Sequence, residues 1–307
     1  MELLPLKLTA AENRRALLFS AAGRLFLLGA TSLSLLGILL IFYFVIKEGA
    51  SFFTSINLWD VLTSTKWHPE DSEHPEYGIA AILVGSFYVT FCAILVAAPL
   101  GILCAVFLSD ILPRRLRNYA KPIVELLAAI PSVAYGFFAL LVLAPWLQEN
   151  LGFTSGVCIL NASLLIAVMA LPTMVSVSED VLTAVGREVR ESSYSLGATR
   201  KETVLRVVLP QARRGIGVAV MLGTMRAVGE TMVVWMAAGN SNQVPTPWWD
   251  LGTSVRTLTA TIAAEMGEAA NGSGHYHSLF GLATILLVII FLLNAVVLWF
   301  QRGGKNA

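Results

Sequence analysis

The stretch LFGLATILLVIIFLLNAVVLWF, residues 279–300, contains no charged side chain in 22 positions. A helix of about 20 apolar residues crosses the hydrocarbon core of a bilayer, so this stretch predicts a membrane-spanning helix. Outward from it lie five further apolar runs, at residues 25–46, 79–108, 123–147, 157–178 and 215–238. The sequence therefore predicts an all-α integral membrane protein with six transmembrane helices.

The amino-acid composition excludes an ordinary soluble domain. Of the 307 residues, 56% are hydrophobic and 13% are charged, whereas soluble globular chains carry about 25% charged residues. The mean hydropathy is +0.71, and the net charge of +1 points to no partner by itself. The cysteines Cys92, Cys104 and Cys158 lie in apolar runs without metal-ligand spacing, so we expect them to act as small apolar side chains.

Lysine and arginine divide the predicted loops into two groups. Of the 21 basic residues, 17 lie before the first run, after the last one, or in the loops that follow the second and fourth runs. The positive-inside rule places these segments in the cytoplasm. We therefore expect a cytoplasmic tail (1–24), a first transmembrane helix (25–46), a periplasmic loop (47–78), a main membrane domain (79–301) and a cytoplasmic tail (302–307).

Three segments differ in length or charge from a simple membrane-spanning run. The run 25–46 is longer than the apolar core of a secretory signal, so we expect it to remain in the protein. The run 79–108 is too long for one straight crossing, and we expect a kink near Pro99. The semi-apolar stretch 253–270 is too charged to span; it either lies on the outer surface or re-enters the membrane.

The predicted cytoplasmic loop at about 179–214 has the pattern of two short helices. We expect a first helix from Glu191, ended by Gly197 in a left-handed turn. Thr199 and Glu202 have capping-box spacing and predict the start of a second helix that ends at Pro210. A rigid bent element of this kind suits docking to another protein, although helices that merely cap the bundle would give the same pattern.

The spacing in this loop resembles the EAA loop of binding-protein-dependent ABC permeases. Glu191 is followed by Gly197 and then by Leu209 and Pro210 at the family's intervals, with Ser192 and Ser193 in place of the two alanines. The resemblance implies an ABC type-1 permease bundle with a cytoplasmic coupling helix. It implies that Glu191 caps this helix, that Gly197 makes its turn, and that the loop contacts an ATPase.

A further resemblance, to PstC-type permease subunits of phosphate importers, covers residues 60–300. The similar segments are Lys66 with Trp67 and residues 130–138, 171–173, 226–232 and 257–269. This resemblance implies an ATP-driven importer of inorganic phosphate in the bacterial cytoplasmic membrane. The implied partners are a second, PstA-type permease subunit, a PstB-type ATPase dimer and a periplasmic PstS-type phosphate-binding protein.

Two opposite charges lie inside the fifth predicted span. Arg226 is the twelfth residue of the 24-residue run 215–238, and Glu230 follows four positions later, on the same face of a continuous helix. A charge at mid-membrane costs about 2.5–3.5 kcal/mol on insertion scales. We expect Arg226 to face the substrate pathway and bind a passing oxyanion, with a structural ion pair between helices as the alternative. Glu125 is a weaker candidate, because it lies two residues into the third span on the cytoplasmic side and could simply snorkel.

The chain contains no nucleotide-binding P-loop and no catalytic motif, so we expect a translocation subunit, not an enzyme. It predicts no cofactor, no metal site and no nucleic-acid partner. The pair His275 and His277 lacks a third ligand nearby, and we expect it to lie in a solvated loop. Three alternatives remain open: a permease for another oxyanion such as sulfate or molybdate, a stand-alone secondary transporter, and an assembly subunit of a membrane complex.

Overall fold

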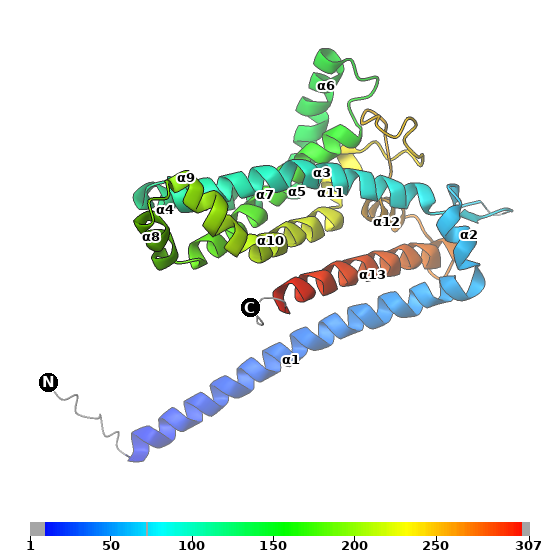
Figure 1. Cartoon of the computed structure of the whole chain (residues 1–307). Coiled ribbons are helices and arrows are strands. Elements are labelled where there is room, and N and C mark those ends of the chain that lie inside the picture. The colour runs from blue at the N-terminus through cyan, green and yellow to red at the C-terminus, as the bar shows by residue number, and fades with distance from the viewer. Residues whose placement is uncertain (1–9, 72, 303–307) are drawn as a thin grey trace.

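The computed structural model describes residues 10–71 and 73–302, and these residues are mostly helical (Figure 1). The first half contains α1 (Ala10–Ser55), α2 (Leu58–Thr63), β1 (Trp67–His68), β2 (Glu76–Tyr77), α3 (Ala80–Val106), the π-helical turn η1 (Phe107–Ile111), α4 (Arg114–Leu126), the 3₁₀ turn η2 (Leu127–Ala129), α5 (Ser132–Phe138), the π-helical turn η3 (Ala139–Leu143) and α6 (Ala144–Leu151). The second half contains α7 (Ile159–Ala184), α8 (Arg187–Ser195), α9 (Arg200–Thr203), the π-helical turn η4 (Val204–Val208), α10 (Leu209–Gly229), α11 (Met232–Ala237), α12 (Leu258–Glu265) and α13 (Gly274–Arg302).

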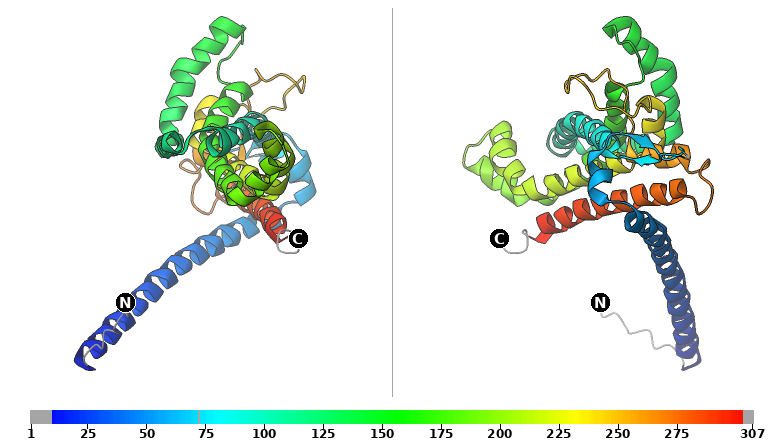
Figure 2. Two further views of the ribbon diagram at one scale, coloured as in Figure 1. Left: turned by 60° about the vertical axis from the view of Figure 1, so that its left-hand side comes forward. Right: turned by 90° about the vertical axis from the view of Figure 1, so that its right-hand side faces the viewer.

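Helix α7 is the centre of the bundle. In the most apolar 18-residue window of α7, 67% of the residues are buried, against 0% in that of α1. The main core is formed by α3, α5, α7, α11 and α12, around side chains such as Ile166 and Met174. Helix α1 packs on α13 at one end only, and its N-terminal half leaves the bundle (Figures 1 and 2). The apolar surface of α1 is therefore exposed in this chain, as expected of a helix that faces lipid.

Within residues 10–71 and 73–302, five helices are long and apolar enough to cross a membrane. They comprise Ser20–Thr54, Ala80–Ile111, Ser132–Leu151, Ile159–Ala184 and Gly274–Gln301. The first lies within the long helix α1, which includes much of the predicted N-terminal tail; residues 1–9 and 303–307 lie outside the described residues. The third begins nine residues later than expected, because α4 continues to Leu126 and the helix restarts after Pro131.

The fifth predicted span, 215–238, is not one continuous helix. Helix α10 ends at Gly229, Glu230 has an extended backbone (φ −70°, ψ 132°), and α11 begins at Met232. Thr259 of α12 donates its hydroxyl proton to the backbone carbonyl of Glu230 at 2.7 Å, which provides a partner for one backbone group freed by the break. The count of six spans therefore stays a prediction, since the α10–α11 segment is interrupted and carries several arginines.

Two prolines lie within continuous helical segments. Helix α3 contains Pro99 and continues past it to Val106, in agreement with the expected continuation beyond this proline. Pro210 was expected to end a helix and does not: α9, η4 and α10 follow one another without a break from Arg200 to Gly229. The π-helical turn η4 precedes Pro210 and widens the helix, which relieves the clash between the proline ring and the preceding turn.

The two ends of the bundle differ. The start of α1, the end of α13 and the α8–α9 element lie toward one end, whereas α2 and the β1–β2 hairpin lie at the other (Figure 1). This arrangement agrees with the division of loops by basic residues. Helix α12 from the stretch 253–270 is largely buried, with Ala260 and Thr261 at 0% exposure. It inserts into the protein beside Glu230, which favours the re-entrant alternative over the surface one.

Candidate functional site

The α8–α9 element is a rigid helix–turn–helix. Gly197 has a φ of +85°, as the left-handed turn at this position predicts. The turn is closed by backbone hydrogen bonds from Gly197 N to Tyr194 O at 2.9 Å and from Ala198 N to Ser193 O at 3.3 Å. The hydroxyls of Ser193 and Thr203 are 2.9 Å apart and buried, which joins the two arms. The element therefore holds its shape by itself.

The second arm starts with the capping box that the sequence predicts. Thr199 accepts a hydrogen bond from Glu202 N, and the Glu202 carboxylate accepts one from Thr199 N at 3.0 Å. The backbone N–H of Thr199, followed by its hydroxyl, lowers the pKa of Glu202 below its ordinary value of 4.5.

This lowered pKa predicts a pH dependence of the second arm. A carboxylate whose folded pKa is lowered stabilises the fold above its unfolded pKa, and this contribution is lost as the pH falls through the folded value. Hydrogen exchange at the Thr203 amide, corrected for the intrinsic rate, should lose protection below pH 4.5. Glu202→Gln should remove this pH step, and Thr199→Ala should lower protection about fivefold at neutral pH. Equal protection in all three proteins would contradict the role of the capping box.

Three residues that the sequence suggests for ATPase coupling, Glu191, Leu209 and Pro210, differ in their surroundings. The α8 helix begins at Arg187 with Gly186 as its N-cap, so Glu191 lies in mid-helix with an exposed side chain and does not cap α8. Leu209 is half-buried against an inner cluster that includes Val208 and Leu182. Pro210 is exposed within the continuous helix. Of these three residues, only Glu191 and Pro210 have exposed side chains.

The sequence reasoning missed Leu196. This side chain is 90% exposed, directly before the Gly197 turn, and Tyr194 beside it is 41% exposed. Together they form an apolar tip on an otherwise polar element. The position of this leucine next to the turn glycine, outside the apolar face of either arm, could have indicated an exposed contact residue.

Arg226 and Glu230 form a loose ion pair at the break between α10 and α11. The Arg226 Nε lies 3.9 Å from Glu230 Oε1, too far for a hydrogen bond. This Nε is buried and has no hydrogen-bond partner among the described residues. The side chain of Arg226 is 34% exposed and that of Glu230 15%. Arg226 and Glu230 therefore lie close together as predicted, although the helix ends at Gly229 and the two residues do not share a continuous helical face.

Two other arginines show the contrast. Arg256 Nη1 lies 2.5 Å from the buried Glu265, which also accepts from Trp67 Nε1 and contacts His275. Arg190 makes three hydrogen bonds of 2.7–2.8 Å and a fourth, longer one of 3.4 Å. Arg256 Nε, like Arg226 Nε, has no hydrogen-bond partner among the described residues, but its Nη1 is firmly paired. In the described part of the chain Arg226 has a single, distant ion-pair partner, so its guanidinium retains donors for an anion.

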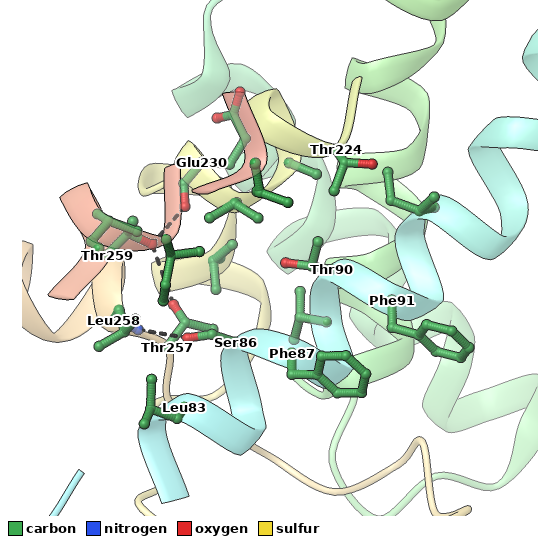
Figure 3. A pocket seen from close by; sticks show the side chains of 18 residues that line it. Leu83, Ser86, Phe87, Thr90, Phe91, Thr224, Glu230, Thr257, Leu258 and Thr259 are labelled. Atoms are coloured by element: carbon green, nitrogen blue, oxygen red, sulfur yellow. Dashed lines mark hydrogen bonds between the residues drawn. The ribbon is translucent and has the colours of Figure 1, made fainter. Parts of the chain in front are cut away.

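Glu230 also lines a cavity of about 340 Å³ between α3, α10, α11, α12 and α13 (Figure 3). Its walls are mainly apolar, with hydroxyls from Ser86, Thr90, Thr224, Thr257 and Thr259. Most of these hydroxyls already donate inside the protein, for example Ser86 to Ile82 O and Thr224 to Val220 O. Because an oxyanion needs free donors, the cavity itself is a poor anion site, and the face of Arg226 is the better candidate.

The remaining sequence candidates are structural. Glu125 accepts a hydrogen bond from Ser176 at 3.0 Å. His275 and His277 do not lie in a solvated loop: they are in the first turn of α13, next to Glu265 and Glu48. Among residues 10–71 and 73–302, no three His, Cys, Asp or Glu side chains are grouped so that they could hold a metal ion.

The bundle and its projecting element define the class of the protein as an ABC permease fold. A bacterial alginate ABC transporter, crystallised with an alginate-bound periplasmic protein, aligns with a TM-score of 0.60 and 16% identity over 94% of this chain and 97% of that one. The methionine transporter MetNI, in an inward-facing conformation, aligns with a TM-score of 0.53 and 18% identity over 74% of this chain and 94% of that one. At these identities the likeness concerns the fold alone.

Sequence comparison gives the family. Residues 97–303 match the family described as binding-protein-dependent transport system inner membrane component, and the chain belongs to this family. A probable ABC transporter permease protein, YqgH of Bacillus subtilis, is 38% identical over 80% of this chain and 78% of its own length. The phosphate transport system permease protein PstC of Mesorhizobium japonicum is 38% identical over 76% of both chains. PstC 2 of Mycobacterium tuberculosis is 31% identical over 92% of this chain and 93% of its own.

Proposed function

We propose that this chain is a permease subunit of an ATP-driven importer and translocates inorganic phosphate across the cytoplasmic membrane. The observation that carries the proposal is Arg226, an arginine inside the bundle whose guanidinium is only loosely paired. A protein retains such a charge at high cost, and a planar cation with free donors suits a phosphate oxyanion. The names of the PstC relatives support phosphate as the substrate.

The proposed assembly has three protein partners. A PstA-type permease subunit completes the pathway, an ATPase dimer docks on the α8–α9 element, and a periplasmic phosphate-binding protein delivers substrate. We place the α8–α9 element, the start of α1 and the end of α13 in the cytoplasm, because most basic residues lie at this end of the bundle. The lipid bilayer covers the exposed apolar faces, and no nucleic acid is involved.

The proposed mechanism uses the continuity of the helix from α9 to α10. Its first residue, Arg200, lies in the docking element, and its last, Gly229, precedes Glu230. When ATP binding closes the ATPase dimer, the docking element moves and this rod carries the movement to the Arg226–Glu230 pair. The bundle then turns from inward- to outward-facing and presents Arg226 to phosphate released by the binding protein.

The test is uptake of labelled phosphate in cells that lack their own high-affinity system. The chain is supplied with its partner permease and binding protein, with and without the ATPase, and with sulfate and molybdate as competitors. Uptake that needs the ATPase and ignores both competitors supports the proposal. Uptake without the ATPase indicates a secondary transporter, and inhibition by sulfate or molybdate indicates another oxyanion as substrate.

The exposed tip of the docking element gives a further prediction. Leu196→Ser removes the apolar side chain that would enter a groove of the ATPase, and central apolar contacts carry much of the affinity of an interface. The amount of ATPase that co-purifies in mild detergent should fall about tenfold. Leu205→Ser, at an exposed leucine on the same loop but away from the turn, is the matched control. Equal loss in both variants would contradict a docking contact centred on Leu196.

A further inference from the structure

Arg190 lies next to Glu191 on α8, but its side chain points into the protein. Its Nε donates to Asp110 Oδ1 at 2.8 Å, and its Nη2 lies 3.4 Å from Asp110 Oδ2. The same Nη2 donates to Leu182 O at 2.8 Å, and Nη1 donates to Gly186 O at 2.7 Å. The side chains of Arg190 and Asp110 are only 15% and 4% exposed. Arg190 therefore has little surface left for contact with another protein.

The partners of Arg190 belong to different helices. Asp110 is in η1, the π-helical end of α3, and its carboxylate is also held by the Ser109 hydroxyl at 2.5 Å. Leu182 is in the last turn of α7, where backbone carbonyls lack helical partners, and Gly186 is the turn between α7 and α8. One guanidinium thus fastens the docking element to the ends of two core helices.

The two arms of the docking element are attached in different ways. The second arm is covalently continuous with α10 and so reaches Glu230 directly. The first arm is joined to α7 by a short turn at Gly186, and its lateral link to α3 passes through Arg190 and Asp110. Helices α3 and α7 pack closely along their length, and α3 carries the cavity residues Ser86 and Thr90. The Arg190–Asp110 contact thus connects α8 to the helix that carries one wall of this cavity.

We propose that Arg190 is a positioning residue that transmits movement of the docked α8 to α3 and α7 through Asp110. The inference rests on the proposed function, since it requires an ATPase on the α8–α9 element. The chemistry of the site explains why an arginine is needed. A guanidinium serves the carboxylate and two carbonyls at once in fixed directions, whereas a lysine keeps the charge but cannot hold all three.

The test compares Arg190→Lys, Asp110→Asn and the double variant in proteoliposomes with the partner permease, ATPase and phosphate-binding protein. We expect each variant to retain bound ATPase, while phosphate transported per ATP hydrolysed falls at least about fivefold. The double variant should be no worse than either single one, because both remove the same link. Arg187→Lys, at an exposed arginine on the same helix, is the matched control and should behave as wild type.

The ratio of transport to hydrolysis separates this role from simple stabilisation. A purely structural contact would lower the amount of assembled complex and leave the ratio per bound ATPase unchanged, and that result would overturn the proposal. Additive losses in the double variant would overturn it as well. If the wild-type chain itself retains no ATPase, the proposed function is wrong. This result comes from the wild-type protein alone and is therefore distinct from a failure of the Arg190 proposal.

Discussion

Arg226→Gln is expected to abolish phosphate uptake while the subunit still inserts and assembles. Glutamine keeps a hydrogen-bond donor but loses the positive charge, and the Glu230 carboxylate is then left without its counter-charge in the pathway. Charge-assisted hydrogen bonds are each worth about 1.5–3 kcal/mol. The loss of two such bonds to an oxyanion predicts a decrease in uptake of about 100-fold or more.

The measurement is the initial rate of labelled phosphate uptake, normalised to the amount of assembled complex. Arg213→Gln, at an exposed arginine on the same helix, should leave this rate unchanged. Arg226→Lys should retain part of the activity, because it keeps the charge and loses the planar fork. Unimpaired uptake by Arg226→Gln would assign the Arg226–Glu230 pair to helix packing. Loss of the assembled complex in Arg226→Gln would likewise assign the pair to helix packing.

The spans that could be predicted well are those with uninterrupted apolar runs. The runs at 79–108, 157–178 and 279–300 lie within α3 with η1, α7 and α13, apart from one or two residues at the start of the first two. Local chemistry was equally informative at Gly197 and at the Thr199–Glu202 capping box, since both depend on neighbouring residues alone. These features need no knowledge of which helices meet.

The errors occur where a local rule has two outcomes. Pro210 can end a helix or be absorbed by a π-helical turn, and the chain takes the second course. The run 215–238 is apolar enough for a span, yet it breaks at Glu230, where Thr259 of α12 supplies a partner for the freed carbonyl. Glu191 has the spacing of the EAA loop, but helix α8 already begins at Arg187, so Glu191 lies inside the helix and does not cap it.

Contacts between residues far apart in the chain could not be predicted from the sequence. Asp110 and Arg190 are 80 positions apart, and Trp67 and Glu265 are 198 positions apart. Hydrophobic periodicity shows which face of a helix is buried, but it does not say which helix covers that face. The buried contacts of Arg190, a basic residue in a polar loop, could for this reason not be predicted.

Gly197→Val is the second variant for which a large effect is expected: it should lose the ATPase during purification in mild detergent. An added Cβ at Gly197 would meet no atom within 4 Å, so the variant does not fail through a clash. The cost comes from the backbone, since a φ of +85° is unfavourable for residues with a side chain by about 1–2 kcal/mol. A β-branched residue is the least tolerant. The turn should therefore open and displace Leu196, and bound ATPase should fall about tenfold.

Gly197→Asn is the matched control, because asparagine adopts the left-handed conformation more readily than other residues with a side chain. It adds a side chain of similar size at the same place and should retain most of the ATPase. Membrane insertion should be equal in both variants, since a Cβ added at Gly197 meets no atom within 4 Å. Normal co-purification of the ATPase with Gly197→Val would show that docking does not depend on this turn. Equal loss with Gly197→Asn would show that the added side chain, and not the backbone angle, blocks the partner.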